Sequence, residues 1–149
     1  MQLRGIFVIL FSLSVFASAE EIKYKVCKSP SGNVSMVEVT PCPYQPCILQ
    51  VGQEYNIQVT FTSFVHSQTS KALVQGILEG KTSPSPYFPN DDGCNSGIKC
   101  PIVPGNHRYE ITLPVLEEYP VGSLEVKWEL RDDTNKNLFC IEFRVSIVD

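Results

Sequence analysis

The 149-residue sequence is poor in the residues and motifs that most enzymes use for catalysis. It has only two histidines, His66 and His107, and it contains no Gly-x-Ser-x-Gly, His-Glu-x-x-His or glycine-rich phosphate-binding motif. Acidic pairs occur at 91–92, 117–118 and 132–133, all in expected loops, where solvated charge is the ordinary explanation. We therefore expect a protein that is not an enzyme and that needs no cofactor.

Positive charge is also scarce, because 12 Lys and Arg are set against 16 Asp and Glu, giving a net charge of −4. A chain with this balance and no basic stripe does not favour phosphate backbones, so nucleic acid is not an expected partner. The cysteine spacings and the two histidines do not match the usual zinc-binding patterns. No metal site is expected.

Long apolar runs are absent after residue 19. The one run, residues 6–16, follows Arg4 and precedes Ala17-Ser18-Ala19, the small-x-small pattern that signal peptidase accepts. The run is shorter than the roughly 18 residues that a membrane-spanning helix needs. We interpret residues 1–19 as a cleaved secretory signal peptide and residues 20–149 as one domain of ordinary size.

Six cysteines are the feature that this sequence has in quantity. In a secreted chain they indicate a disulfide framework, although sequence alone leaves many connectivities open. Two pairs each close a short loop of turn-forming residues, and pairing these locally leaves the two outermost cysteines for each other. The predicted bonds are Cys42–Cys47, Cys94–Cys100 and Cys27–Cys140.

Apolar and polar residues alternate along much of the chain, which is typical of strands with one buried face. No segment shows a sustained helical period, and turn residues separate the alternating runs. The pattern predicts an all-β sandwich of about seven antiparallel strands in two sheets. The expected strands are 22–26, 34–40, 55–62, 71–79, 108–115, 124–131 and 139–147.

Cys27 and Cys140 both fall on the polar phase of their strands. A bond between them is therefore expected outside the core, where it joins two strand edges. Residues 132–137 are expected to form the hairpin turn between the last two strands, because they lack the ligand pattern of a calcium loop.

Several segments stand in the order and spacing of a known family, and together they extend over the whole chain after residue 19. They are residues 41–47, 59–63, 92–102, 113–115, 118–120 and 138–140. In these segments the chain resembles the soluble Niemann-Pick type C sterol carriers of the lipid-recognition (ML) domain family. The resemblance implies an immunoglobulin-like sandwich, the three disulfides above, and a sterol held between the sheets. It also implies a secreted, possibly lysosomal protein that is a monomer.

The resemblance also implies which residues bind the lipid. Tyr87 or Phe88 stands where the family has a Phe between prolines at the tunnel mouth. Alternation alone does not distinguish such a pocket from a closed core. A second interpretation is a co-receptor of the same family that presents another lipid to a receptor. The residues that match the other pocket-lining positions are Tyr55, Leu113, Pro114, Val115, Tyr119 and Trp128.

Three departures from the family are visible. The apolar Met-Gly-Val beside the family's pocket mouth is Glu79-Gly80-Lys81 here, which weakens the case for direct docking to the usual membrane sterol transporter. The family's Trp after the last cysteine is Ile141, a smaller group. The family's glycosylation sequon in the strand around Val59 is lost, because Gln58 stands in its place. The remaining acceptor is Asn33, in Asn33-Val34-Ser35.

Overall fold

The computed structural model describes Gly5, residues 19–84 and residues 90–149. In this part of the chain the fold is built from strands and one short 3-10 helix, and no helix is long and apolar enough to cross a membrane. The elements are β1 (Glu20–Glu21), β2 (Lys25–Val26), β3 (Gly32–Thr40), β4 (Cys47–Gln50), β5 (Glu54–Ser63), β6 (Lys71–Leu78), β7 (Lys81–Pro84), η1 (Gly93–Asn95), β8 (Gly105–Pro114), β9 (Gly122–Arg131) and β10 (Asn137–Val148).

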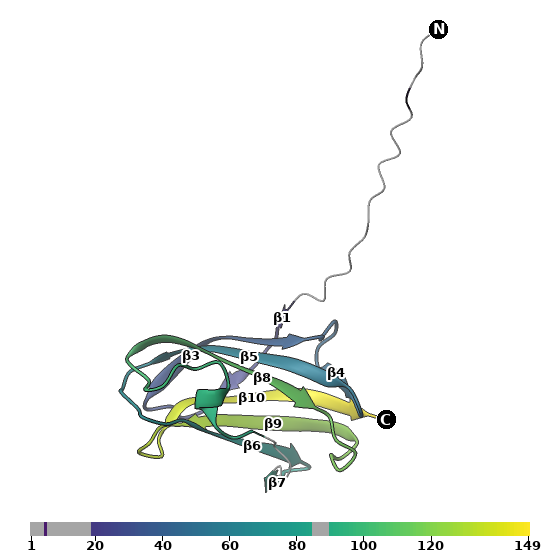
Figure 1. Cartoon of the computed structure of the whole chain (residues 1–149). Coiled ribbons are helices and arrows are strands. Elements are labelled where there is room, and N and C mark those ends of the chain that lie inside the picture. Colours follow the sequence, from purple (N-terminus) through teal and green to yellow (C-terminus); the bar gives the residue numbers. More distant parts are fainter. Residues whose placement is uncertain (1–4, 6–18, 85–89) are drawn as a thin grey trace.

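The strands form two sheets that lie one above the other (Figure 1). One sheet has the order β1-β3-β5-β8, and the other has the order β2-β10-β9-β6-β7, with β4 also pairing with β10. This arrangement confirms the predicted two-sheet sandwich. The described residues form ten strands rather than about seven, because three short strands were not expected as separate elements.

The first and fourth strands account for most of the difference from the expected pattern. The segment 22–26 was expected to be one strand, but β1 pairs with β3 in one sheet and β2 pairs with β10 in the other. The chain therefore changes sheets between residues 21 and 25. Strand β4 runs parallel to β10, with Cys47 opposite Val145, so the second sheet is not wholly antiparallel.

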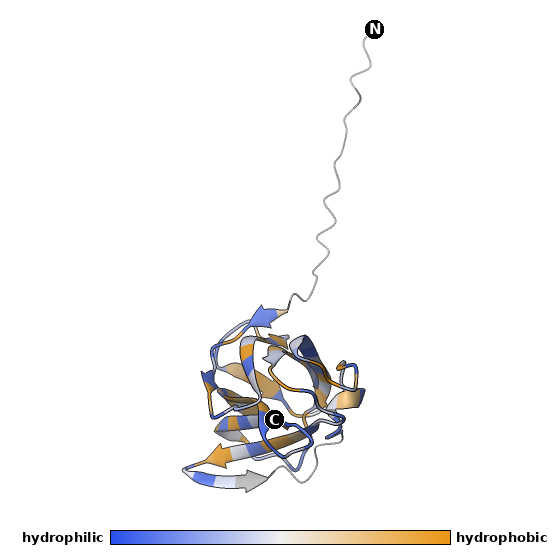
Figure 2. Cartoon of the chain, turned by 90° about the vertical axis from the view of Figure 1, so that its left-hand side faces the viewer, coloured by the Kyte–Doolittle hydropathy of each residue, from blue (hydrophilic) through white to orange (hydrophobic). Residues whose placement is uncertain are grey.

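Alternation along the long strands places their apolar side chains in the space between the sheets. In β5 the buried residues are Tyr55, Ile57, Val59 and Phe61, and the residues between them are only partly buried. Figure 2 shows the same mixture of apolar and polar residues along the strands. Each sheet thus has one face that must be covered by the other.

Four aromatic rings fill the interior at one end of the sandwich. Phe139 contacts Phe61 and Tyr109 edge to face, with ring centroids 5.4 and 5.6 Å apart. Tyr109 in turn contacts Trp128, with centroids 6.0 Å apart. Edge-to-face pairs of this kind add to the free energy of burial, and they leave this end of the core closed.

The three disulfides have the predicted connectivity, with Cα atoms 5.0 Å apart in Cys27–Cys140, 5.1 Å in Cys42–Cys47 and 5.6 Å in Cys94–Cys100. The Cys27–Cys140 bond closes a loop of 113 residues. In the chain-entropy description, a loop of about 100 residues contributes about 4.7 kcal/mol to stability.

The Cys27–Cys140 bond lies outside the apolar cluster between the sheets, as expected, but Cys140 is nevertheless buried, with only 1% of its surface exposed. It does lie on the polar phase of β10, but that phase is covered at this point. The buried carboxylate of Glu129 on β9 lies 3.9 Å from the Cys140 sulfur. Lys127 and Arg131 pair with the same carboxylate at 3.4 and 2.8 Å, so its charge is compensated.

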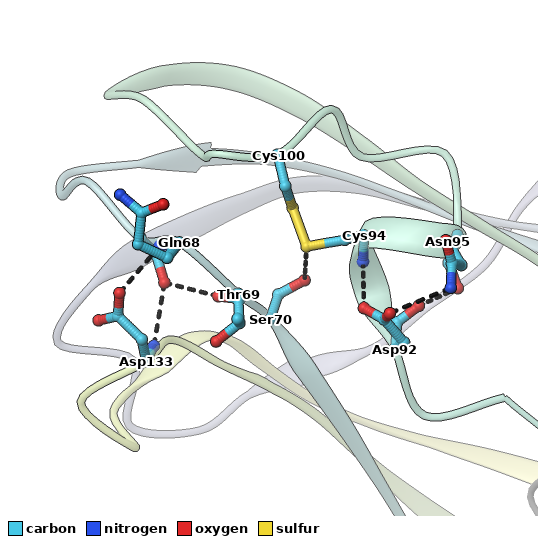
Figure 3. The surroundings of a disulfide bond; sticks show 10 residues. Gln68, Thr69, Ser70, Asp92, Cys94, Asn95, Cys100 and Asp133 are labelled. Atoms are coloured by element: carbon cyan, nitrogen blue, oxygen red, sulfur yellow. Dashed lines mark hydrogen bonds between the residues drawn. A yellow bond between two sulfur atoms is a disulfide. The ribbon is translucent and has the colours of Figure 1, made fainter.

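The Cys94–Cys100 bond closes a short loop within the segment before β8, and the Ser70 hydroxyl lies 3.7 Å from the Cys94 sulfur (Figure 3). Asp92 caps η1, since its carboxylate accepts hydrogen bonds from the Cys94 backbone N–H at 2.9 Å and from Asn95 at 3.0 Å. The backbone N–H of Gly93 donates to the Ser70 carbonyl at 3.0 Å. These contacts tie the segment to the residue that precedes β6.

The turn between β9 and β10 forms as expected and is organised by one buried carboxylate, that of Asp132. It accepts hydrogen bonds from Ser31, from the backbone and hydroxyl of Thr134, and from the Lys136 backbone, at 2.6 to 2.9 Å. Burial by itself raises the pKa of Asp132, but these donors outweigh burial and hold the pKa below its ordinary value.

We predict that Asp132→Ala lowers the free energy of unfolding by about 3 kcal/mol at neutral pH, because buried donors lose their acceptor. A lowered folded-state pKa stabilises the fold above the unfolded-state pKa, and that stabilisation is lost as the pH falls through the folded-state value. The difference between wild type and variant should therefore shrink in acid. Urea unfolding across pH measures both effects, with Asp133→Ala as the control. A difference that is independent of pH would contradict the assignment.

Candidate functional site

A cavity of about 530 Å³ lies between the sheets, beyond the aromatic cluster. Its walls come from both sheets: Ile57 and Leu113 contribute from one, and Val74, Val126 and Phe143 from the other. The volume is within the range of about 300–1,000 Å³ that is usual for small-molecule sites. The sandwich is therefore not packed throughout. The alternating pattern of the strands could not decide between a pocket and a closed core.

Four of the eight predicted lipid-binding residues border this cavity, namely Leu113, Val115, Tyr119 and Trp128. Tyr55 and Pro114 do not border it, although both lie on strands that do. Tyr87 and Phe88 lie outside the described residues. The predicted residues that border the cavity thus come from β8, β9 and the link between them, whereas much of the remaining wall comes from β6 and β10.

Tyr55 is buried and has a structural contact that explains its position outside the cavity wall. Its hydroxyl accepts a hydrogen bond from the Gln50 backbone N–H at 2.8 Å. Gln50 is the last residue of β4, so the contact fastens the end of β4 to the start of β5. Tyr55 supports the neighbouring wall residue Leu49 rather than facing the cavity.

The link after β8 holds Val115 and Tyr119 against the cavity. The Val115 backbone donates to the Gln53 carbonyl and accepts from the Gly52 N–H, both at 2.9 Å. The Tyr119 N–H donates to the Leu116 carbonyl at 3.1 Å, which closes a turn. Val115 is consequently buried and Tyr119 half-buried, so the two side chains are placed at different depths.

Sequence reasoning named no lipid-binding residue of the wall on β4, β6 or β10, none of the wall residues on β5, and on β9 only Trp128. A usable signal existed for most of them, because they occupy the inward phase of alternating strands. The short strand β4 gave no such signal over its four residues. These additional wall residues are Leu49, Ile57, Val74, Leu78, Leu124, Val126, Phe143, Val145 and Ile147.

Trp128 separates the cavity from the closed end of the core. Its side chain is fully buried, borders the cavity and contacts Tyr109 on its other side. Burial raises the pKa of Tyr109 well above its ordinary value, so the ring that packs behind Trp128 is uncharged at neutral pH.

Charge is confined to the mouth of the cavity, where Glu79, Lys81 and Glu118 are all exposed. Glu79 and Gly80 form the two-residue turn of the β6–β7 hairpin, with φ angles of 51° and 77°. Both residues need the left-handed conformation that this turn type requires, which glycine adopts readily and glutamate does not. The mouth thus joins an apolar interior to a rim of mixed charge.

The cavity wall is poor in the side chains that most often bind metals. No three His, Cys, Asp or Glu side chains gather into a possible metal site within residues 19–84 and 90–149. In the same ranges the cavity wall includes no His, Ser, Thr or Cys. What this geometry provides is a mainly apolar cavity between the sheets that is open to solvent at its charged mouth.

Comparison with known proteins gives consistent matches over the same residues. A family model for the ML domain matches residues 21–147. The chain is 49% identical to NPC intracellular cholesterol transporter 2 of Danio rerio over 150 residues, which cover 100% of both chains. It is 45% identical over 148 residues to the protein of that name from Mus musculus, covering 99% of each.

A solved structure agrees with this result. The crystal structure of a Niemann-Pick type C2 protein from the Japanese carpenter ant matches with a TM-score of 0.79 and 26% identity, covering 85% of this chain and 100% of that one. The sequence matches and the fold are therefore in agreement over nearly the whole length. The chain belongs to the ML-domain family.

Proposed function

We propose that the protein is a carrier that binds cholesterol or a related sterol in the cavity between its sheets and transfers it between membranes or proteins. The observation that carries this proposal is the enclosed apolar cavity of about 530 Å³, in a chain that is 49% identical over its full length to a cholesterol transporter. Two relatives that match the chain over at least 99% of its length are named as cholesterol transporters, which supports a carrier rather than an enzyme.

Burial of apolar surface is sufficient to drive binding. A lipid that buries about 500 Å² of apolar area gains roughly 12 kcal/mol before the costs of association and ordering are subtracted. The deep wall presents aliphatic side chains and the indole of Trp128, whereas the charged side chains lie at the mouth. We infer that the sterol enters with its hydrocarbon part first and leaves its hydroxyl near the mouth.

Val115 and Tyr119 provide the direct test of the proposed site. Val115→Phe should fill part of the cavity, and Tyr119→Ser should remove a ring from its wall, so each should weaken binding of a fluorescent sterol at least tenfold. Displacement titration on the purified protein measures the affinities. Matched controls are Val121→Phe and Tyr44→Ser, since these side chains are 55% and 73% exposed and border no part of the cavity. Wild-type protein that binds no sterol would refute the proposal.

Glu79 and Lys81 affect the step in which cargo leaves. Charged side chains at the rim must lose water when the mouth meets an apolar surface, which is costly. Docking to a membrane or to a membrane sterol transporter is therefore expected to be weaker here than with an apolar rim. The proposal treats the protein as a monomer that releases cargo at this mouth.

We predict that the double variant Glu79→Met, Lys81→Val transfers sterol to neutral liposomes several-fold faster than wild type. Stopped-flow fluorescence with a sterol donor and a liposome acceptor measures the rate. Glu117→Gln removes one exposed charge outside the cavity wall and serves as the control. Equal rates for the double variant and wild type would show that the rim charges do not limit transfer. Tight binding without transfer would instead favour a co-receptor that presents its lipid.

Three disulfides are consistent with an oxidising compartment, and we infer secretion with a possible lysosomal destination. Asn33 lies near the start of β3 with an exposed side chain, and Ser35 is exposed as well. Both positions of the acceptor sequence are therefore accessible to a glycosyltransferase. We propose that Asn33 carries an N-linked glycan.

Glycosylation is tested by expression in a eukaryotic secretory host. Wild-type protein should lose apparent mass on treatment with peptide N-glycosidase, and Asn33→Gln should migrate at the trimmed position without treatment. Asn137→Gln, which removes an amide outside any acceptor sequence, should still carry the glycan. A wild-type band that the enzyme does not shift would rule out a glycan at Asn33.

A further inference from the structure

A second hollow lies at the edge of β10, where this strand changes partners. β2 pairs with Ile141 and Glu142, whereas β4 pairs with residues 145–148. Phe143 and Arg144 therefore lie between the ends of two short strands. A hollow of about 310 Å³, here called the edge groove, opens at this gap. Among the residues that the structure describes, it shares only Phe143 with the lipid cavity, so the two are separate sites.

The base of the edge groove is apolar. Ile22, Cys47 and Phe143 border it, and each is at most 5% exposed. Tyr24 adds a half-buried aromatic ring to the same wall. The groove therefore reaches below the charged surface of the sheet.

Gln45 holds one side of the groove in place. Its side-chain carbonyl accepts a hydrogen bond from the Lys23 backbone N–H at 2.8 Å, and its amide donates to the Glu21 carbonyl at 3.1 Å. The Cys42–Cys47 disulfide closes the loop that carries Gln45. A wall fixed in this way loses little freedom when a ligand binds.

Charged side chains of both signs surround the apolar base. Lys25 on β2 is in register with Glu142 on β10, and Arg144 on β10 is in register with Glu125 on β9. Lys23 adds a third cation. The ion pairs found in the described part of the chain include none of these five side chains. Their charges are therefore available to a ligand.

The two signs lie at different depths. The two carboxylates are half-buried, whereas the three cations are exposed at the rim. A simple anion would meet the carboxylates, and a simple cation would meet the cations, so neither is well matched. A ligand with a positive group at its inner end and a negative group next to it matches both sets. An aromatic ring at the base suits a quaternary ammonium group, which aromatic faces attract.

We propose that the edge groove binds a phosphocholine group. The trimethylammonium group lies on Tyr24 beside Glu142, and the phosphate lies at the rim against Lys25 and Arg144. The remainder of the molecule then points out of the groove. Free phosphocholine and the headgroup of phosphatidylcholine carry the same recognition chemistry. The site is outside the lipid cavity and does not depend on the carrier function.

Titration of the purified protein with phosphocholine, followed by the NMR signals of the backbone amides, tests the site. Saturable shifts should centre on residues 22–25, 45–47 and 142–144. Choline alone and inorganic phosphate alone should each bind at least tenfold more weakly, because each satisfies only one set of charges. Displacement of phosphocholine by vesicles of phosphatidylcholine would assign the lipid headgroup as a source, and binding of free phosphocholine alone would assign the soluble form.

Two variants separate the two charges. Arg144→Gln should weaken binding of inorganic phosphate at least fivefold and leave choline unchanged, whereas Glu142→Gln should weaken choline and not phosphate. A general loss of structure would not produce such opposite effects. Lys28→Gln removes an exposed cation outside the groove, so this matched control should bind both as wild type does.

Three outcomes overturn the inference. They are phosphocholine that produces no saturable shifts, shifts confined to residues of the lipid cavity, and equal weakening of choline and phosphate by both variants. Titration of the same protein with a fluorescent sterol reads the lipid cavity alone. Failure of the edge groove and failure of the carrier function are therefore distinguished.

Discussion

The whole molecule depends on one constraint: two sheets must bury a common apolar interior that their side chains do not completely fill. Side-chain burial drives closure of the sandwich, yet a ligand space requires that part of this interior stays unpacked. The chain meets both demands by packing one end of the interior and leaving a cavity toward the other end. Phe61, Phe139, Tyr109 and Trp128 pack one end closely, and the cavity occupies the remainder. Well-packed aromatic rings thus offset the contacts that the cavity lacks.

Much of the fold could be predicted from the sequence, because a strand with one buried face alternates by simple geometry. The long strands and the two short-loop disulfides follow from such local signals, and the Cys27–Cys140 bond follows as the remaining pair. Strand β4 was missed because four residues are too few to show a period, and its parallel pairing with β10 joins segments far apart in the chain. The burial of Cys140 was missed for a related reason: its polar phase is covered by Glu129, whose two cationic partners permit a buried carboxylate. Alternation indicates on which face of the sheet a side chain lies, but it does not indicate what covers that face.

The site was predictable in part. Residues in matching motifs, such as Val115, Tyr119 and Trp128, do border the cavity, whereas Tyr55 follows the same alternation and instead bonds to the Gln50 backbone. Whether an inward side chain meets a void or a neighbour depends on the distance between the sheets, which no local pattern encodes. The rim residues Glu79 and Lys81 were visible as departures from the family, but their place at the cavity mouth follows from the β6–β7 hairpin.

The change of sheet between β1 and β2 has a mechanical consequence. Ile22 donates its N–H to Val37 in one sheet, and Cys27, a few residues later, donates to Cys140 in the other and is covalently bound to it. The segment 22–27 thereby joins the two sheets along one side of the sandwich. The segment around η1 bridges the other side near the aromatic end, since it bonds to Ser70 beside β6 and to Glu110 on β8. Within the described residues β7 is the edge strand of its sheet and pairs only with β6, so we expect a wider lipid to displace this hairpin before it displaces the joined sides of the sandwich.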